Sequence, residues 1–345
     1  MLKIKTSLPA GFFEASPGDL NKLLGGPTLF HLKGKRAPAL FVSVLLHGNE
    51  PAGFSAIQKV LAKTEYGGGT LRLPRSLILF IGNVAAAEAG LRHLPGQPDY
   101  NRIWPGAEAL GTPEHKMMRQ IAREMKSRGL FASVDLHSTT GMNPHYACVN
   151  QLDASFLHLA SLFSRTVVYF RFPKGVQSLI FSEFTTAVTV ECGKVGDKTG
   201  VEHGEDFLSA CLKLSEFPRR EVAAHDVNLY HTVGRVTVAK DASFSFGDEA
   251  ADIRFVDHLD SYNFNELPAG TILARVDQTD RPLIEVLNEQ GRNVTGDYFL
   301  IGDGFLKTKA RVMPSMLTRD ESIIRNDCLC YVMERYPFAL AFPDS

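Results

Sequence analysis

Apolar strand-like runs and amphipathic helical stretches alternate along the first two-thirds of the chain. Continuous apolar runs without helical spacing predict strands at residues 39–46, 76–83, 131–136, 166–170 and 187–191. Apolar positions that recur at helical spacing predict helices from about Pro51, from Thr112 to Arg128, and near residues 153–164 and 205–216. Strands separated by helices predict an α/β domain whose mostly parallel or mixed sheet is flanked by helices.

The pattern changes after about residue 221. Glycine, proline, aspartate and asparagine then separate short β-rich runs, with no strong helical periodicity, at residues 234–239, 271–276, 283–287, 298–301 and 306–312. This pattern predicts a separate, smaller β-rich domain. We therefore place an α/β domain at residues 1–222 and a β-rich C-terminal domain at residues 223–345.

Composition and charge exclude several classes of partner. The 345 residues carry a formal net charge of -1 and their basic residues are dispersed, so we expect no nucleic-acid partner. No apolar run approaches the ~18 residues that a membrane helix needs, and the first residues lack the apolar core of a secretion signal. The five cysteines are scattered and odd in number, which favours a reducing compartment over a disulfide framework. We expect a soluble cytoplasmic protein without a membrane partner.

Three polar clusters follow predicted strands, at the edge where α/β sheets place their active sites. His47 and Glu50 come directly after the first long strand, Asp135 and His137 close the strand at 131–136, and Glu191 ends the strand at 187–191. Such groups at the ends of buried strands need partners. Two imidazoles and a carboxylate are a ligand set that zinc accepts while keeping a fourth position for water.

Spacing supports a metal site without establishing it. Only two residues separate His47 from Glu50, and Gly48 allows the backbone to bend sharply between them. A competing motif, His203-Gly-Glu-Asp206, precedes the helix predicted at 205–216, where acidic residues in a first turn need no metal. The alternative interpretation, that His47 is a hydrogen-bonded core histidine, stays open at this point.

A fourth candidate is the pair Asn101-Arg102. The surrounding segment PDYNRIWPG combines prolines with aromatic residues, which is typical of a shaped loop. The planar guanidinium of Arg102 suits a carboxylate, and Asn101 adds neutral donors. A salt bridge that merely anchors the loop is the alternative. Arg92 could present a second cation to the same region, and an ordinary solvated arginine is the alternative there.

Taken together, the motifs HGNE, NRIWPG, DLHSTTG and VECGK resemble those of the succinylglutamate desuccinylase/aspartoacylase family, the acylase branch of the zinc carboxypeptidase-like hydrolases. They occur in the family's order over about residues 40–200, and the β-rich C-terminal third also fits the family's architecture. The resemblance implies one Zn²⁺ per chain, with His47, Glu50 and His137 as its ligands. It also implies that Glu191 is the base that activates water.

The resemblance further implies that Asn101-Arg102 grips a substrate carboxylate and that Arg92 polarises the scissile carbonyl. Arg92 lies about two residues farther from this pair than the family pattern suggests, and Trp104 replaces the more usual phenylalanine. The expected activity is zinc-dependent hydrolysis of the amide bond of a small anionic N-acyl amino acid. A carboxypeptidase-like peptide or other amide hydrolase, and a non-catalytic zinc-binding protein, are the alternatives. A homo-oligomer is left open.

Overall fold

The computed structural model describes residues 1–64, 66–67, 70–108, 111–277 and 281–341. Contacts divide the chain into two compact units. The first unit comprises Met1–Ser138, His145–Asn228 and Phe338–Ser345, and the second comprises Thr139–Pro144 and Leu229–Pro337. The domain limits expected from the sequence, 1–222 and 223–345, stay a prediction.

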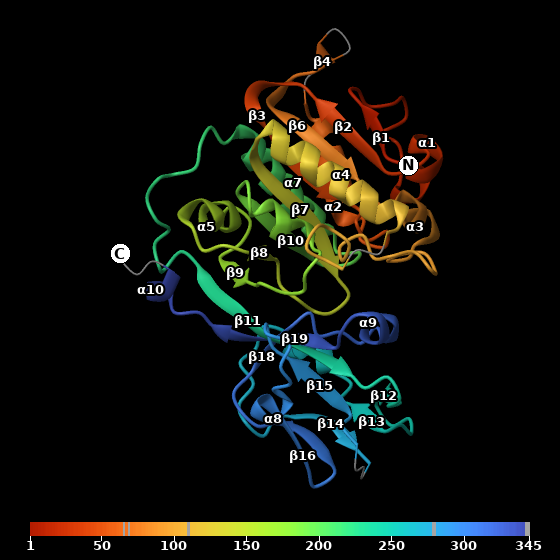
Figure 1. The fold of residues 1–345 in the computed structure, drawn as a ribbon, viewed down its shortest axis with the longest axis vertical. Helices are drawn as coiled ribbons and strands as arrows, with labels where there is room; N and C mark the ends of the chain where they lie inside the picture. The colour runs from red at the N-terminus through yellow and green to blue at the C-terminus, as the bar shows by residue number, and fades with distance from the viewer. Residues whose placement is uncertain (65, 68–69, 109–110, 278–280, 342–345) are drawn as a thin grey trace. The chain divides into compact units, whose positions relative to one another are not determined.

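A mixed sheet forms the centre of the first unit, as Figure 1 shows. Its strands run in the order β1-β2-β6-β3-β7-β10-β8-β9. The central strand β3 is parallel to both β6 and β7, whereas β2 is antiparallel to β6 and β8 is antiparallel to β10. The strand bounds are β1 (Lys3–Lys5), β2 (Thr28–Leu32), β3 (Gly34–Val44), β6 (Leu73–Ile81), β7 (Leu130–Thr139), β8 (Tyr146–Val149), β9 (Thr166–Tyr169) and β10 (Ala187–Lys194). Strand β4 (Tyr66–Gly67) pairs with β5 (Thr70–Leu71) in a separate two-stranded antiparallel sheet.

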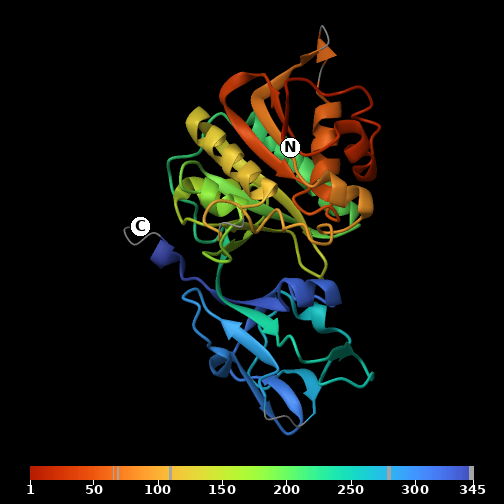
Figure 2. The same cartoon turned by 45° about the vertical axis from the view of Figure 1, so that its right-hand side comes forward.

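Helices cover this sheet on both faces. On one face, Gly53 of α2 approaches Val44 and Leu136, and α2 packs against α7. On the other face, Phe181 of α6 meets Phe41 at 4.8 Å between ring centroids, and α6 contacts α4, the yellow helix in Figures 1 and 2. Successive strand residues point to opposite faces, which is why Phe41 and Val44 serve different layers. The helix bounds are α1 (Leu20–Leu24), α2 (Ala52–Ala62), α3 (Val84–Ala89), α4 (Pro113–Arg128), α5 (Ala154–Ser161), α6 (Gln177–Phe181), α7 (Lys198–Lys213) and α10 (Phe338–Ala341).

The predicted fold class is confirmed, and so are most elements of the first unit. Helix α4 shows why: the Thr112 hydroxyl accepts a hydrogen bond from the His115 N–H, and Gly129 ends the helix with a φ of 68°. The predicted start of one helix is wrong. Helix α7 begins at Lys198 rather than near residue 205, so His203 and Glu205 lie inside the helix and not at its first turn.

The second unit is built from strands around its own apolar core. Strand β11 (Asn228–Val238) pairs with β15 (Ile284–Leu287) and β19 (Cys330–Arg335), and β19 pairs with β18 (Met313–Ser315). A five-stranded sheet has the order β12-β13-β14-β17-β16. Its bounds are β12 (Phe244–Phe246), β13 (Ile253–Phe255), β14 (Ile272–Val276), β17 (Phe305–Thr308) and β16 (Phe299–Gly302). Two short helices, α8 (Thr295–Tyr298) and α9 (Glu321–Asn326), interrupt a region in which the sequence showed no strong helical pattern.

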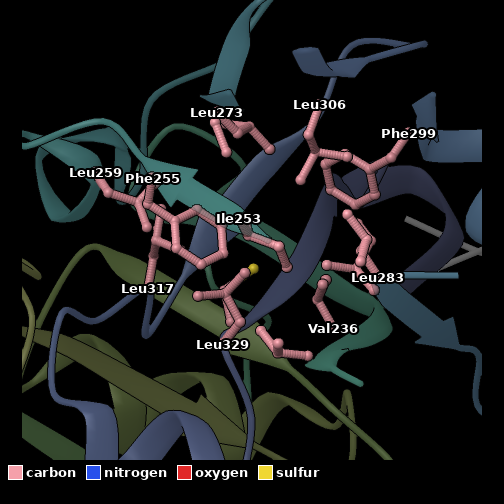
Figure 3. Close-up of a cluster of buried hydrophobic side chains, with 14 of the residues drawn as sticks. Val236, Ile253, Phe255, Leu259, Leu273, Leu283, Phe299, Leu306, Leu317 and Leu329 are labelled. Atoms are coloured by element: carbon pink, nitrogen blue, oxygen red, sulfur yellow. The ribbon is translucent and has the colours of Figure 1, made fainter. Parts of the chain in front are cut away.

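Alternating apolar residues of these strands meet in one cluster. Figure 3 shows Phe255, Val236 and Leu329 among the side chains that point into it. Each of them is almost completely buried. This core gives the second unit its own source of hydrophobic stability, at about 25 cal/mol for each Å² of apolar surface removed from water.

Two further observations concern the chain as a whole. All five cysteines are buried, and none of them forms a disulfide. Within the described part of the chain, no helix combines the length and the apolar character needed to cross a membrane.

Candidate functional site

The turn after β3 places His47 and Glu50 beside each other. Gly48 allows this turn to pack closely against its neighbours, because a Cβ at this position would lie 2.3 Å from backbone atoms of Ala86 and Ala87. The Glu50 N–H donates to the His47 carbonyl at 3.3 Å, which closes the turn. The two side chains therefore project from a tight turn that packs directly against helix α3.

The structure brings His47, Glu50 and His137 together. One potential ligand atom from each lies within 4.8 Å of the others, and all three residues are buried. The Nδ1 atom of His47 lies 2.8 Å from Glu50 Oε1, and the Nδ1 atom of His137 lies 2.7 Å from Glu50 Oε2. The carboxylate thus lies between two imidazoles from different strand ends.

The outer nitrogens of both histidines meet carboxylates. His47 Nε2 lies 3.0 Å from Asp99 Oδ1, and His137 Nε2 lies 2.9 Å from Asp135 Oδ2. A histidine that donates Nε2–H to a carboxylate presents the lone pair of Nδ1 to the centre of the site, as metal-binding histidines do. The donor set and its supporting carboxylates fit a zinc ion.

Glu50 and His137 change each other's pKa. Burial by itself raises the pKa of the Glu50 carboxyl, but the imidazoles of His47 and His137 outweigh burial and lower this pKa far below its usual range. Burial by itself lowers the pKa of His137, but the Asp135 and Glu50 carboxylates outweigh burial and raise this pKa well above its ordinary value. A metal ion binds ionised carboxylate and neutral imidazole, so its binding would displace a proton from His137.

Asp99 is a part of the site that the sequence did not reveal. Its carboxylate contacts His47 and also pairs with Arg92, whose Nε lies 3.0 Å and whose Nη2 lies 2.9 Å from Asp99 Oδ2. Burial raises the pKa of Asp99, but His47 and Arg92 outweigh burial and hold it well below its ordinary value. The only available signal was its position two residues before Asn101. Arg92 also approaches Glu50 Oε1 at 3.7 Å, so it lies at the cluster.

Asn101 and Arg102 lie on the same loop, next to His137. Asn101 Nδ2 is 3.1 Å from His137 Nε2, and Asn101 Oδ1 accepts a hydrogen bond from the Gln177 N–H at 3.1 Å. The Arg102 Nη1–H donates to the Asn101 carbonyl at 2.8 Å. Asn101 therefore contacts one of the clustered histidines, which sequence reasoning did not foresee.

Glu191 lies on β10, the neighbour of β7 in the sheet, and it is buried. Its Oε2 atom is buried without a hydrogen-bond partner among the described residues. Burial raises the pKa of Glu191 to about 7, with the charges of His137, Glu50 and His47 also acting on it. A buried carboxyl with a pKa near neutrality can both accept and release a proton.

A helix-flanked mixed sheet that gathers two histidines, a glutamate and a second carboxyl with one unpaired oxygen at its strand ends has the composition of a metallohydrolase site. Comparison with known proteins makes the class specific. The model of the succinylglutamate desuccinylase/aspartoacylase catalytic domain matches residues 36–211. The chain belongs to the succinylglutamate desuccinylase/aspartoacylase family, whose members are hydrolytic acylases.

Individual relatives are distant. The chain is 24% identical to a succinylglutamate desuccinylase of Burkholderia orbicola (strain MC0-3) over 267 residues, which cover 69% of this chain and 71% of that protein. The structure of a succinylglutamate desuccinylase from Chromobacterium violaceum matches with a TM-score of 0.55 and 18% identity, covering 87% of this chain and 85% of the other. Murine aminoacylase 3 matches with a TM-score of 0.52 and 15% identity, covering 88% and 97%. The two solved structures share the fold.

Proposed function

We propose that this protein is a zinc-dependent hydrolase that cleaves the amide bond of a small anionic N-acyl amino acid. The proposal rests on one observation above all: His47, Glu50 and His137 converge beside strand β10, which carries a buried carboxyl, Glu191, with an unpaired oxygen. Ligands and base are thus separate groups. Family membership supports acyl hydrolysis, and the ligand set supports one zinc ion per chain.

His47 Nδ1, His137 Nδ1 and the Glu50 carboxylate would hold the ion. When bound, zinc supplies a Lewis acid that polarises the acyl carbonyl and lowers the pKa of water to about 7. Asp99 and Asp135 accept hydrogen bonds from the outer nitrogens of the histidines and so fix the orientation of both rings.

Glu191 would move the proton. Its unpaired Oε2 accepts a proton from the attacking water and then delivers it to the leaving amine. A pKa of about 7 suits both steps, because the carboxyl neither holds nor rejects the proton strongly at neutral pH.

Arg92 and the pair Asn101-Arg102 would act on the substrate. The Arg92 guanidinium lies 3.7 Å from Glu50, close enough to the ligand cluster to stabilise negative charge that develops on the carbonyl oxygen. Arg102 would bind the substrate carboxylate, and Asn101, whose Oδ1 is held by the Gln177 N–H, has an amide N–H group for the same anion. A carboxylate bound there orients the amide toward Glu191. A cytoplasmic location stays a prediction from the sequence.

The direct test is a panel of N-acyl amino acids and short peptides, assayed for released amine with zinc present and after chelation. Chelator-sensitive release from one N-acyl amino acid, exceeding that from peptides, is the expected result. Release that survives chelation, or peptides as the preferred substrates, would contradict the proposal.

Zinc content tests the ligand set separately. His137→Ala removes one of three protein ligands, so we expect it to lose stoichiometric zinc in elemental analysis. His158→Ala is the matched control, because His158 lies on α5 and contacts the Arg220 carbonyl instead of the cluster. Full zinc retention in His137→Ala would remove this residue from the ligand set.

A further inference from the structure

The segment 91–102 carries Arg92, Asp99, Asn101 and Arg102, yet most of it is loop. Its first end is fixed, because the Gly48 N–H donates to the Arg92 carbonyl at 3.0 Å. Its last residues are fixed by Asp99, whose Oδ1 accepts from the Asn101 N–H at 2.7 Å. The stretch between Arg92 and Asp99 needs its own anchor if both side chains are to stay at the ligand cluster.

That stretch contains a tight turn with suitable residues. Proline and glycine occupy the two central positions, Pro95 and Gly96, and Gly96 has a φ of 75°. The Gln97 N–H donates to the Leu94 carbonyl at 3.0 Å and closes the turn. Proline at the second position and a positive φ at the third are typical of a type II turn. The turn therefore fixes where the Gln97 side chain begins.

The Gln97 side chain then joins the turn to the sheet. Its Oε1 accepts two hydrogen bonds, one from Asn83 Nδ2 at 2.8 Å and one from the Leu94 N–H at 3.0 Å. Its Nε2 lies 3.4 Å from the Tyr100 hydroxyl. One amide group thus links the loop before Asp99, the loop after it, and Asn83.

Asn83 is a rigid attachment point. It is 1% exposed, and its N–H donates to the Leu45 carbonyl at 2.6 Å, just before the turn that carries His47. Its Oδ1 caps helix α3 by accepting from the Ala86 N–H at 3.2 Å. A residue held at these two points by backbone groups can hold a loop in turn.

We propose that the Asn83–Gln97 hydrogen bond is a latch that positions Arg92 and Asp99 against the zinc ligand His47. Gln97 is then a positioning residue, acting only through Asp99, which follows it by two residues, and through Arg92, which Asp99 binds. This inference rests on the proposed zinc-hydrolase function. Loss of the latch loosens the Asp99 carboxylate, which weakens both the orientation of His47 and the placement of the Arg92 guanidinium.

The decisive variants change one amide at a time. Gln97→Met keeps the length of the side chain but removes the acceptor, whereas Gln97→Glu keeps an acceptor for Asn83 and Leu94. We expect Gln97→Met to bind zinc about tenfold more weakly and to lower kcat about tenfold with KM nearly unchanged. Gln97→Glu should restore both quantities to within about threefold of the original protein, since the acceptor remains.

A matched control separates positioning from general stability. Gln58 on α2 donates from Nε2 to the carbonyls of Phe12 at 2.8 Å and Ala15 at 2.9 Å, away from the ligand cluster. Gln58→Met makes the same chemical change and loses two hydrogen bonds, so its melting temperature should fall while zinc affinity and kcat are kept. An equal loss of zinc affinity in Gln58→Met would overturn the positioning role.

A double-mutant cycle tests the bond itself. Asn83→Ser retains a good helix cap but is too short to reach Gln97. If the latch is the cause, Asn83→Ser combined with Gln97→Met should lose no more zinc affinity than Gln97→Met alone. Independent, multiplying losses would mean that the two residues act separately and would overturn the latch.

Hydrogen–deuterium exchange keeps this inference distinct from the proposed function. Exchange in peptides covering residues 91–102 of the zinc-free protein should rise in Gln97→Met and stay unchanged in Gln58→Met. If the original protein proves not to be a zinc hydrolase, this measurement still decides whether the latch exists. Unchanged exchange in Gln97→Met would overturn the latch even when zinc binding and hydrolysis are confirmed.

Discussion

Replacing Glu191 with glutamine should lower turnover and, in the zinc-free protein, raise stability. Glutamine has the same shape as glutamate but cannot accept the proton of an attacking water. Loss of a general base costs about 10²–10⁴-fold in turnover. Because Glu191 is not among the three proposed ligands His47, Glu50 and His137, Glu191→Gln should bind zinc like the original protein while losing this factor in kcat.

The same change should stabilise the zinc-free protein in a pH-dependent way. Burial raises the pKa of Glu191 from its ordinary value of 4.5 to about 7. Because each pKa unit corresponds to about 1.4 kcal/mol, ionised Glu191 costs the folded state about 3 kcal/mol. Below pH 4.5 the carboxyl is protonated in both the folded and the unfolded chain, and the cost is absent. The cost appears as pH rises from 4.5 and is complete above about 7.

The assay is denaturant unfolding of the zinc-free original protein and of Glu191→Gln between pH 4 and pH 8. The two proteins should be about equally stable at pH 4, and Glu191→Gln should gain up to about 3 kcal/mol by pH 8. Glu205→Gln is the control, because Glu205 pairs with Lys63 and its replacement removes a favourable contact. A pH-independent difference for Glu191→Gln, or near-normal turnover, would refute the assignment of Glu191 as a buried base.

Two other variants test the substrate contacts and the ligand turn. Arg102→Ala should lower kcat/KM for an acidic substrate at least tenfold more than kcat/KM for the neutral amide analogue of that substrate. The reason is that a hydrogen bond to a charged group is worth about 1.5–3 kcal/mol. Equal losses for both substrates would mean that Arg102 has a structural role. Gly48→Ala should unfold at a lower denaturant concentration and bind zinc more weakly, because its Cβ would lie 2.3 Å from helix α3. Gly296→Ala is the control and should change neither property, because a Cβ at this position meets nothing within 4 Å. The packing argument would be contradicted if Gly48→Ala bound zinc as tightly as Gly296→Ala.

Local pattern predicted the parts of the site that strand ends carry. The runs before His47, His137 and Glu191 are apolar enough to identify buried strands, and the residues at their ends follow directly. Parallel neighbours in the sheet then bring these ends to one edge, as the pairing of Ser43 with Asp135 shows. That inference required only the spacing of apolar side chains along the sequence and the order of the strands and helices.

The remaining parts depend on contacts that no local pattern specifies. Asp99 reaches His47 only because the loop at residues 91–102 folds back, and that path depends on the Leu94–Gln97 turn and on Asn83. Strands β2 and β8 were missed for a related reason. They are short, and each has one antiparallel neighbour, β6 for β2 and β10 for β8. Tertiary pairing rather than a long apolar run makes them strands.

The charges of the residues around the two histidines explain why this site favours a cation. Three carboxylates, those of Glu50, Asp99 and Asp135, contact the two histidines, and Arg92 is the cation that pairs with Asp99 and approaches Glu50. With both imidazoles neutral, as metal binding requires, the three carboxylates outnumber this guanidinium and leave an excess of negative charge around the histidines. Buried charge without compensation is costly, and a divalent cation removes this excess where an apolar or anionic ligand would not. The same balance explains why Arg92 must be held close by Asp99: moving it away would leave the cluster too negative for the carboxylate-bearing substrate that we propose.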